Sequence, residues 1–194
     1  MKIAYATLAA AALLAASCGS PVAAQERMIT KQVLVKAPVD AVWQAWTTSE
    51  GIKSFFAPDA KVEARADGPF EIYFNPYGAP DTKGADDMRF LALQPQRMLS
   101  FTWNAPPYFP EIRGQRTYVT VRMHPAGDGQ THVTLAHGGW GDGGQWDQVY
   151  DYFDKAWGNV LGNLQKRFVD GPIDWSEHLK RLKGTMDAPA KKPL

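Results

Sequence analysis

Histidines are the side chains of this sequence best suited to metal or acid–base chemistry. The four are His124, His132, His137 and His178. Their intervals do not match those of zinc ligands, and His132 and His137 fall on opposite faces of one predicted strand. We therefore expect no metal site and no cofactor.

His137 is the histidine that we expect to point into the protein. In the segment VTLAH, Val133 and Leu135 share its strand face, so a strand that directs valine and leucine inward also directs this imidazole inward. A buried imidazole can act as a general acid or base, or it can be a hydrogen-bonded residue that stabilises the strand end. The sequence has no nucleophile elbow and no phosphate-binding glycine motif, so an enzymatic hypothesis has to use His137.

Strand parity also assigns faces to the apolar residues of other predicted strands. Phe101 and Trp103 share one face of a strand, and Phe70 lies on the apolar face of another. Arg89 has the same parity as Leu91 and Leu93, which predicts a fixed positive charge close to the apolar face. The alternative is that Arg89 lies at the surface or at the cavity rim.

The elements that must position these residues are a strand, two short helices, six strands and a long helix. Residues 29–35 are typical of a strand, Ala37-Pro38 opens a helix, and Ser49 begins a second short helix that ends near Phe56. The further strands are predicted at 61–66, 70–74, 88–93, 98–103, 117–123 and 132–137. Their close spacing favours an antiparallel meander.

The long helix is predicted from about Gln145 to Phe168. Its large apolar residues step by three or four and form one continuous face: Trp146, Tyr150, Phe153, Trp157, Val160, Leu161, Leu164 and Phe168. The loop HGGWGDGG precedes it and leaves the aromatic end of the helix free to adjust. The predicted fold class is α+β, with a curved antiparallel sheet wrapped around this helix.

The first residues predict export. Residues 1–24 contain a lysine, an apolar run from Ile3 to Ala16 and small residues before Gln25, which is the pattern of a secretory signal peptide. The run is shorter than the ~20 residues that a membrane-spanning helix needs. We expect a periplasmic or secreted protein with no membrane span after cleavage; the alternative is a lipoprotein anchored through Cys18.

Length and charge indicate one domain, residues 25–170, followed by an appendage, residues 171–194. The chain has 21 Lys+Arg and 20 Asp+Glu, and Lys2 is the one charged residue before Gln25, so the processed chain has no net charge. This balance excludes a basic surface for nucleic acid. GPIDWSEHLKRLKG predicts a short helix with Trp175, Leu179 and Leu182 on one side. Nothing in the sequence selects between a monomer and a dimer.

Four segments resemble the START-like (SRPBCC) superfamily, in the branch named for the activator of the heat-shock-protein-90 ATPase. They are APVDAVWQAWTTSEGIKSFFAP, DGPFEIYF, ALQPQRMLSFTW and LAHGGW, the last followed by a helix with Ala156-Trp157. The likeness spans roughly Ile29 to Phe168 and implies a helix-grip fold with a cavity for a small or medium apolar molecule. The chain departs from this family at Pro69, in a proline-rich insertion at 104–110, in its export signal and in the segment from Asp170 onward.

Parity and helical spacing predict which residues line this cavity. The set is Phe56, Phe70, Arg89, Phe101, Trp103, His137, Trp140, Trp146, Tyr150 and Phe153. A polar group among aromatic rings fixes the orientation of a mostly apolar ligand. Tyr108 and Phe109, flanked by prolines, fit either a lid over the cavity mouth or an exposed loop.

Three functions fit these observations. The first is an exported protein that binds an apolar small molecule. The second is an enzyme of the cyclase or hydratase kind, with His137 as general acid or base. The third is the chaperone-accessory role that the family name suggests, against which the predicted export argues because that chaperone and its ATP are cytosolic.

Overall fold

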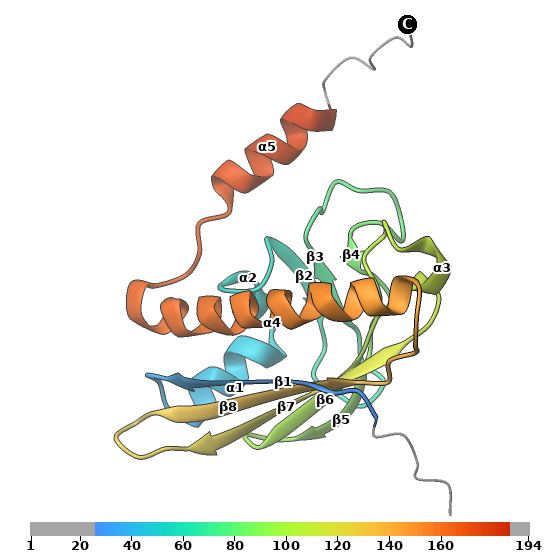
Figure 1. The fold of residues 1–194 in the computed structure, drawn as a ribbon. Helices are drawn as coiled ribbons and strands as arrows, with labels where there is room; N and C mark the ends of the chain where they lie inside the picture. The colour runs from blue at the N-terminus through green and yellow to red at the C-terminus, as the bar shows by residue number, and fades with distance from the viewer. Residues whose placement is uncertain (1–25, 187–194) are drawn as a thin grey trace, which may run out of the picture.

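The structure is a computed structural model that describes residues 26–186. A five-stranded antiparallel sheet, in the order β1-β8-β7-β6-β5, carries the long helix α4 across one face (Figure 1). The elements of this layer are β1 (Ile29–Val35), β5 (Phe90–Gln94), β6 (Met98–Trp103), β7 (Thr117–Pro125), β8 (Thr131–Gly138) and α4 (Gln145–Asp170). The predicted α+β helix-grip fold is confirmed.

A second, smaller sheet stands beside the first. It has the order β2-β3-β4 and consists of β2 (Asp59–Val62), β3 (Phe70–Tyr73) and β4 (Gly84–Ala85). An isolated bridge between Pro69 and Arg89 and the hydrogen bond from the Phe70 amide to the Met88 carbonyl connect the two sheets. The predicted single meander is therefore divided between β4 and β5, where Asp87 (φ 58°) turns the chain.

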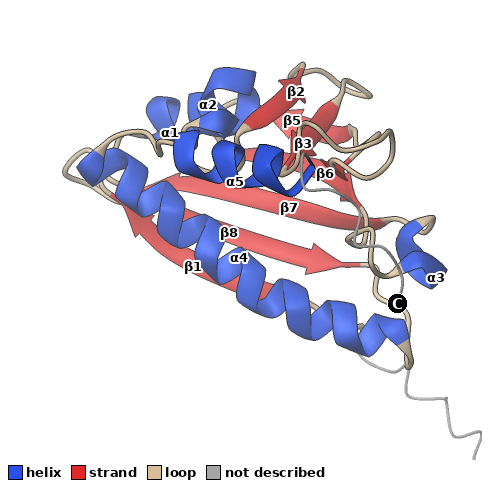
Figure 2. Cartoon of the chain, turned by 90° about the horizontal axis from the view of Figure 1, so that it is seen from above, coloured by secondary structure: helices blue, strands red, loops and turns tan. Residues whose placement is uncertain are grey.

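The helices other than α4 occupy its side of the large sheet or the ends of the molecule. They are α1 (Val39–Thr47), α2 (Ser49–Lys53), α3 (Pro110–Arg113) and α5 (Ser176–Met186). Seen from above, α4 runs obliquely over β1 and β8, with α3 near its amino-terminal end (Figure 2). The strand β4 and the helix α3 were not predicted, because two and four residues are too short to show a periodicity.

The long helix α4 starts abruptly because two glycines precede it. Gly143 and Gly144 have φ angles of 72° and 54°, a region that residues with a Cβ atom rarely adopt. The chain can therefore leave β8 and enter the helix without a side-chain cap. The buried residues of α4 then recur at three- or four-residue steps, as its sequence predicts: Val149, Phe153, Trp157, Leu161 and Leu164.

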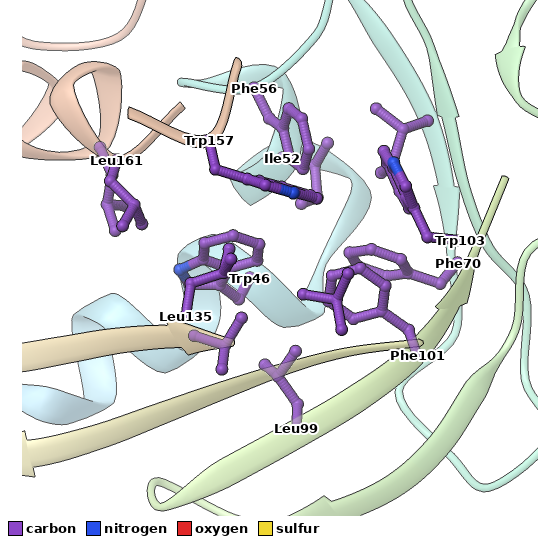
Figure 3. Close-up of a cluster of buried hydrophobic side chains, with 14 of the residues drawn as sticks. Trp46, Ile52, Phe56, Phe70, Leu99, Phe101, Trp103, Leu135, Trp157 and Leu161 are labelled. Atoms are coloured by element: carbon purple, nitrogen blue, oxygen red, sulfur yellow. The ribbon is translucent and has the colours of Figure 1, made fainter. Parts of the chain in front are cut away.

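The core is aromatic and centred on Trp46 of α1. Its side chain is completely buried, meets Phe55 and Phe56 edge-on at ring-centroid distances of 5.1 and 5.9 Å, and stacks on Phe101 at 6.4 Å. Figure 3 shows Trp46 and Phe101 between the strands of the large sheet and Trp157 of α4. Aromatic packing of this kind holds α1 and α4 to the same region of the sheet.

Both ends of the chain extend beyond the residues that the structure describes. The predicted signal peptide, residues 1–24, and the tail, residues 187–194, lie outside the described residues. Between residues 26 and 186, no helix has the length and apolar character that crossing a membrane requires. Helix α5 lies on the same side of the large sheet as α4 (Figure 1).

Candidate functional site

An apolar cavity of about 360 Å³ lies where α4, α5, the small sheet and the loop after β6 meet. We call it the α4–α5 cavity. Its volume is within the ~300–1,000 Å³ typical of small-molecule sites. Its wall consists of Phe56, Phe74, Asn75, Thr82, Lys83, Gly84, Ala85, Trp103, Asn104, Pro106, Pro107, Tyr108, Tyr152, Phe153, Ala156, Trp157, Val160, His178 and Leu182.

Four aromatic rings form the buried part of this wall. Phe56 stacks on Trp103 at 5.9 Å, Phe153 stacks on Trp157 at 6.1 Å, and the two indoles lie 5.3 Å apart. Figure 3 shows Phe56, Trp103 and Trp157 together. None of the residues that line the cavity is an aspartate or a glutamate. Its one lysine is Lys83. Such a wall suits a flat, mostly apolar molecule better than a polar one.

The mouth of the cavity is marked by exposed aromatic residues. Tyr108 is 63% exposed, and Phe74 and Tyr152 are each 41% exposed. The rings of Tyr108 and Tyr152 meet edge-on at 6.1 Å. The proline-flanked loop therefore lies at the cavity mouth and is exposed there. It combines features of the two alternatives that its sequence allows, a lid and an exposed loop.

Three of the predicted lining residues lie in the wall of the cavity: Phe56, Trp103 and Phe153. Phe70 and Phe101 were predicted there but do not line it. Both are completely buried, and their rings lie 4.1 Å apart in the core. Strand parity assigns a face correctly here, but it does not say how deep in the core a side chain lies.

The aromatic residues around the start of α4 form a cluster behind Phe153 of the cavity wall, which corrects the prediction for Trp140, Trp146 and Tyr150. The ring of Trp140 lies 5.2 Å from Tyr150 and 6.5 Å from Trp146, and the Arg27 guanidinium sits 4.2 Å above the Tyr150 ring. The rise of an α-helix places Trp146 about 16 Å from Trp157 along the axis. These residues therefore attach the helix start to the amino-terminal segment and do not line the cavity.

Arg89 does not point inward as strand parity predicts, but lies at the surface, the alternative given for it. Its side chain is 46% exposed, lies 3.5 Å from the Asp87 carboxylate and donates a hydrogen bond to the Asp67 carbonyl. Phe90 faces the core instead, and the register with β6 shifts between Phe90 and Ala92. A β-bulge of this kind breaks the alternation on which the prediction depended.

His137 is buried as parity predicts, but behind the cavity wall and not in it. Its exposure is 0%. Its Nδ1 accepts a hydrogen bond from the Trp157 indole at 2.8 Å, so Nε2 carries the proton and donates to the Thr117 hydroxyl at 2.7 Å. Burial lowers the pKa of His137 to about 3. Nδ1 orients Trp157 and Nε2 holds Thr117, so both ring nitrogens are engaged within the fold and neither is left to act as an acid or a base on a bound molecule.

A buried arginine that the sequence reading missed holds the cavity rim. Arg113 of α3 donates to the Gly84 carbonyl and the Asp86 carboxylate, each at 3.1 Å, and to the carbonyls of Asp81 and Ala105. Burial lowers the pKa of this guanidinium, and Asp86 opposes the shift. One side chain thus ties β4 to the loop after β6, two segments that line the cavity. Its position in a helix of four residues gave no periodic signal.

The described residues contain no group of three or more histidine, cysteine or acidic side chains arranged to hold a metal ion. Fold and site together define an α+β protein of the helix-grip class with an apolar cavity against its carboxy-terminal helices. Residues 36–168 match the family model described as Activator of Hsp90 ATPase homolog 1-like protein, and the chain belongs to this family. No curated protein matches the chain.

Solved structures share this fold at low sequence identity. A protein of Mesorhizobium loti is 21% identical, with a TM-score of 0.61 over 76% of this chain and 100% of its own. The Aha1 dimer of Colwellia psychrerythraea is 20% identical, with a TM-score of 0.57 over 75% and 98%. CalU16 of Micromonospora echinospora is 23% identical, with a TM-score of 0.56 over 82% and 83%. Helix α5 lies beyond the residues that the family model matches.

Proposed function

We propose that the protein is an exported carrier that binds a small, largely apolar molecule in the α4–α5 cavity. The buried aromatic wall of this cavity is the observation that carries the proposal. Phe56, Trp103 and Trp157 are each no more than 4% exposed and face a space large enough for a ligand. The membership of a family with a ligand-binding fold supports the same function, although function resides in the site and not in the fold.

Export is the second part of the proposal and rests on the pattern of residues 1–24. Native mass spectrometry of the protein recovered from its own cell envelope tests both parts. A chain that begins at Gln25 and carries a reproducible small-molecule adduct is the expected result. An unprocessed chain in the cytosol would overturn the export proposal and favour the chaperone-accessory role.

Binding itself can be measured with N-phenylnaphthylamine, a neutral fluorophore that emits strongly in apolar surroundings. We expect saturable binding to the wild-type chain. The variant Ala156→Phe adds a ring inside the cavity and should weaken binding by about tenfold or more, because the ligand and the new ring compete for one volume. Lys166→Phe, which adds the same ring to an exposed position of α4, is the matched control. Equal affinity in all three proteins would overturn the proposed site.

Helix α5 closes one side of the cavity, and this gives a second prediction. Trp175 donates to the Lys53 carbonyl at 2.6 Å and His178 bonds the Phe74 carbonyl at 3.1 Å, which places Leu182 in the cavity wall. Leu182→Gln should weaken N-phenylnaphthylamine binding by about threefold to tenfold, through lost apolar contact. Leu179→Gln changes the same residue type on the same helix outside the cavity wall. The same loss in both variants would exclude a specific role of Leu182 in the wall.

A further inference from the structure

One residue of the α4–α5 cavity wall, Trp103, has a buried polar atom that the fold leaves without a partner. The indole nitrogen Nε1 of Trp103 is sealed from solvent and makes no hydrogen bond within the part of the chain that the structure describes. The Trp103 side chain is 2% exposed, and its ring is part of the cavity wall. A buried N–H without an acceptor is costly in free energy, so native structures rarely retain one without a reason.

The neighbouring tryptophans show that the position of Trp103 is distinctive. Trp157 donates its indole proton to His137 at 2.8 Å, and Trp140 donates to the His137 carbonyl at 2.8 Å. Trp46 also has an unpartnered Nε1, but it lies in the core and does not line the cavity. Trp103 is therefore the described tryptophan that combines a free indole proton with a place in the cavity wall.

The rest of the buried wall contains no carboxylate. Phe56, Phe153 and Trp157 surround the Trp103 ring. Asn104, which is 6% exposed and lines the cavity next to Trp103, adds an amide that can donate or accept. Lys83, the one lysine in the wall, is half-buried, so the fully buried part of the site offers hydrogen-bond donors among aromatic rings.

We infer that the ligand is a neutral ring compound with a ketone or similar carbonyl oxygen at its buried end, and that this oxygen accepts the Trp103 indole proton. The inference rests on the proposed function, because it names the ligand class of the same cavity. The aromatic rings enclose the N–H, so the entering carbonyl group parts them and replaces ring contacts by a hydrogen bond. One donor aimed at an acceptor fixes the orientation of a ligand that is otherwise held by apolar contact.

A pair of fluorescent probes tests this inference. Prodan is a dimethylaminonaphthalene that carries a propionyl ketone, and its emission moves to longer wavelength when the ketone oxygen accepts a hydrogen bond. N-phenylnaphthylamine has similar ring area and no carbonyl group. Trp103→Phe should weaken Prodan binding about fivefold more than it weakens N-phenylnaphthylamine binding, because both probes lose ring contact and only Prodan also loses a hydrogen bond. The emission of bound Prodan should also move to shorter wavelength in this variant.

Trp46→Phe is the matched control, because it removes the other unpartnered indole proton from a position outside the cavity. It should leave the affinity and the emission of Prodan as in the wild type. Equal weakening of both probes by Trp103→Phe, or the same Prodan emission in wild type and Trp103→Phe, would overturn the carbonyl inference alone. Failure of N-phenylnaphthylamine to bind the wild-type chain would instead overturn the proposed function.

Discussion

Replacing Arg113 with methionine is expected to lower the free energy of unfolding by about 3–5 kcal/mol, the usual effect of removing one partner from a buried ion pair. The side chains of Arg113 and Asp86 are only 15% and 10% exposed, and their charged groups lie 3.1 Å apart. Methionine fills much of the space but leaves the Asp86 carboxylate without its cation. Chemical denaturation of wild type and variant at neutral pH measures the change.

The surrounding hydrogen bonds explain why this loss should also reach the cavity. Arg113 donates to the carbonyls of Asp81 and Gly84 on one side and of Ala105 on the other. Without it, the segment that carries β4 and the loop after β6 lose their common anchor. We therefore expect Arg113→Met to weaken N-phenylnaphthylamine binding as well, even though Arg113 does not line the cavity.

Two further variants distinguish the loss of the Arg113–Asp86 ion pair from a general effect of removing a positive charge. Arg116→Met removes a 38% exposed guanidinium that lies 3.8 Å from Asp87, and it should cost less than about 1 kcal/mol. The double variant Arg113→Met/Asp86→Asn should recover part of the stability, because it removes the stranded charge while an amide oxygen can still accept from the Gly84 amide. A loss for Arg113→Met no larger than that for Arg116→Met would show that the buried pair does not stabilise the rim.

The sequence predicts those elements whose pattern is local and repeated. The apolar steps of α4 and the alternation in β6, β7 and β8 reach over six or more residues, so both the type and the approximate bounds of these elements could be inferred. Short elements gave no such signal, as β4 and α3 show. The family resemblance added the arrangement of these elements, which the family match over residues 36–168 confirms.

The cavity was harder to predict because its wall is assembled from segments far apart in the sequence. Phe56, Trp103 and Phe153 could be found by asking which aromatic residues face the helix. Leu182 and His178 could not, since nothing in a short terminal helix indicates which part of the domain it covers. Arg89 was misplaced because a bulge in β5 changes the parity, and a bulge leaves no clear mark in a sequence.

His137 supplies the last prediction, a loss of stability in mild acid. Burial lowers its pKa to about 3 from an ordinary value of 6.5. Between these two values the unfolded chain binds a proton at this site and the folded chain does not, so the free energy of unfolding falls as the pH falls. The slope is about 1.4 kcal/mol per pH unit, and the loss between pH 7 and pH 4.5 is about 3 kcal/mol. Denaturation at the two pH values measures it.

The variant His137→Phe tests whether this imidazole is the source of the pH dependence. It lacks the titrating group, so the difference between its stabilities at pH 7 and pH 4.5 should be smaller than that of the wild type by about 3 kcal/mol. His132→Phe, on the exposed face of the same strand, should retain the wild-type difference. If His137→Phe does not fold, the imidazole ¹⁵N shifts of the wild type still decide the matter, because the ring should stay in its neutral Nε2–H form at pH 4.5. A protonated ring at that pH would contradict the hydrogen bond from Trp157 to Nδ1. It would also contradict the conclusion that His137 positions Trp157 and does not act as an acid or a base.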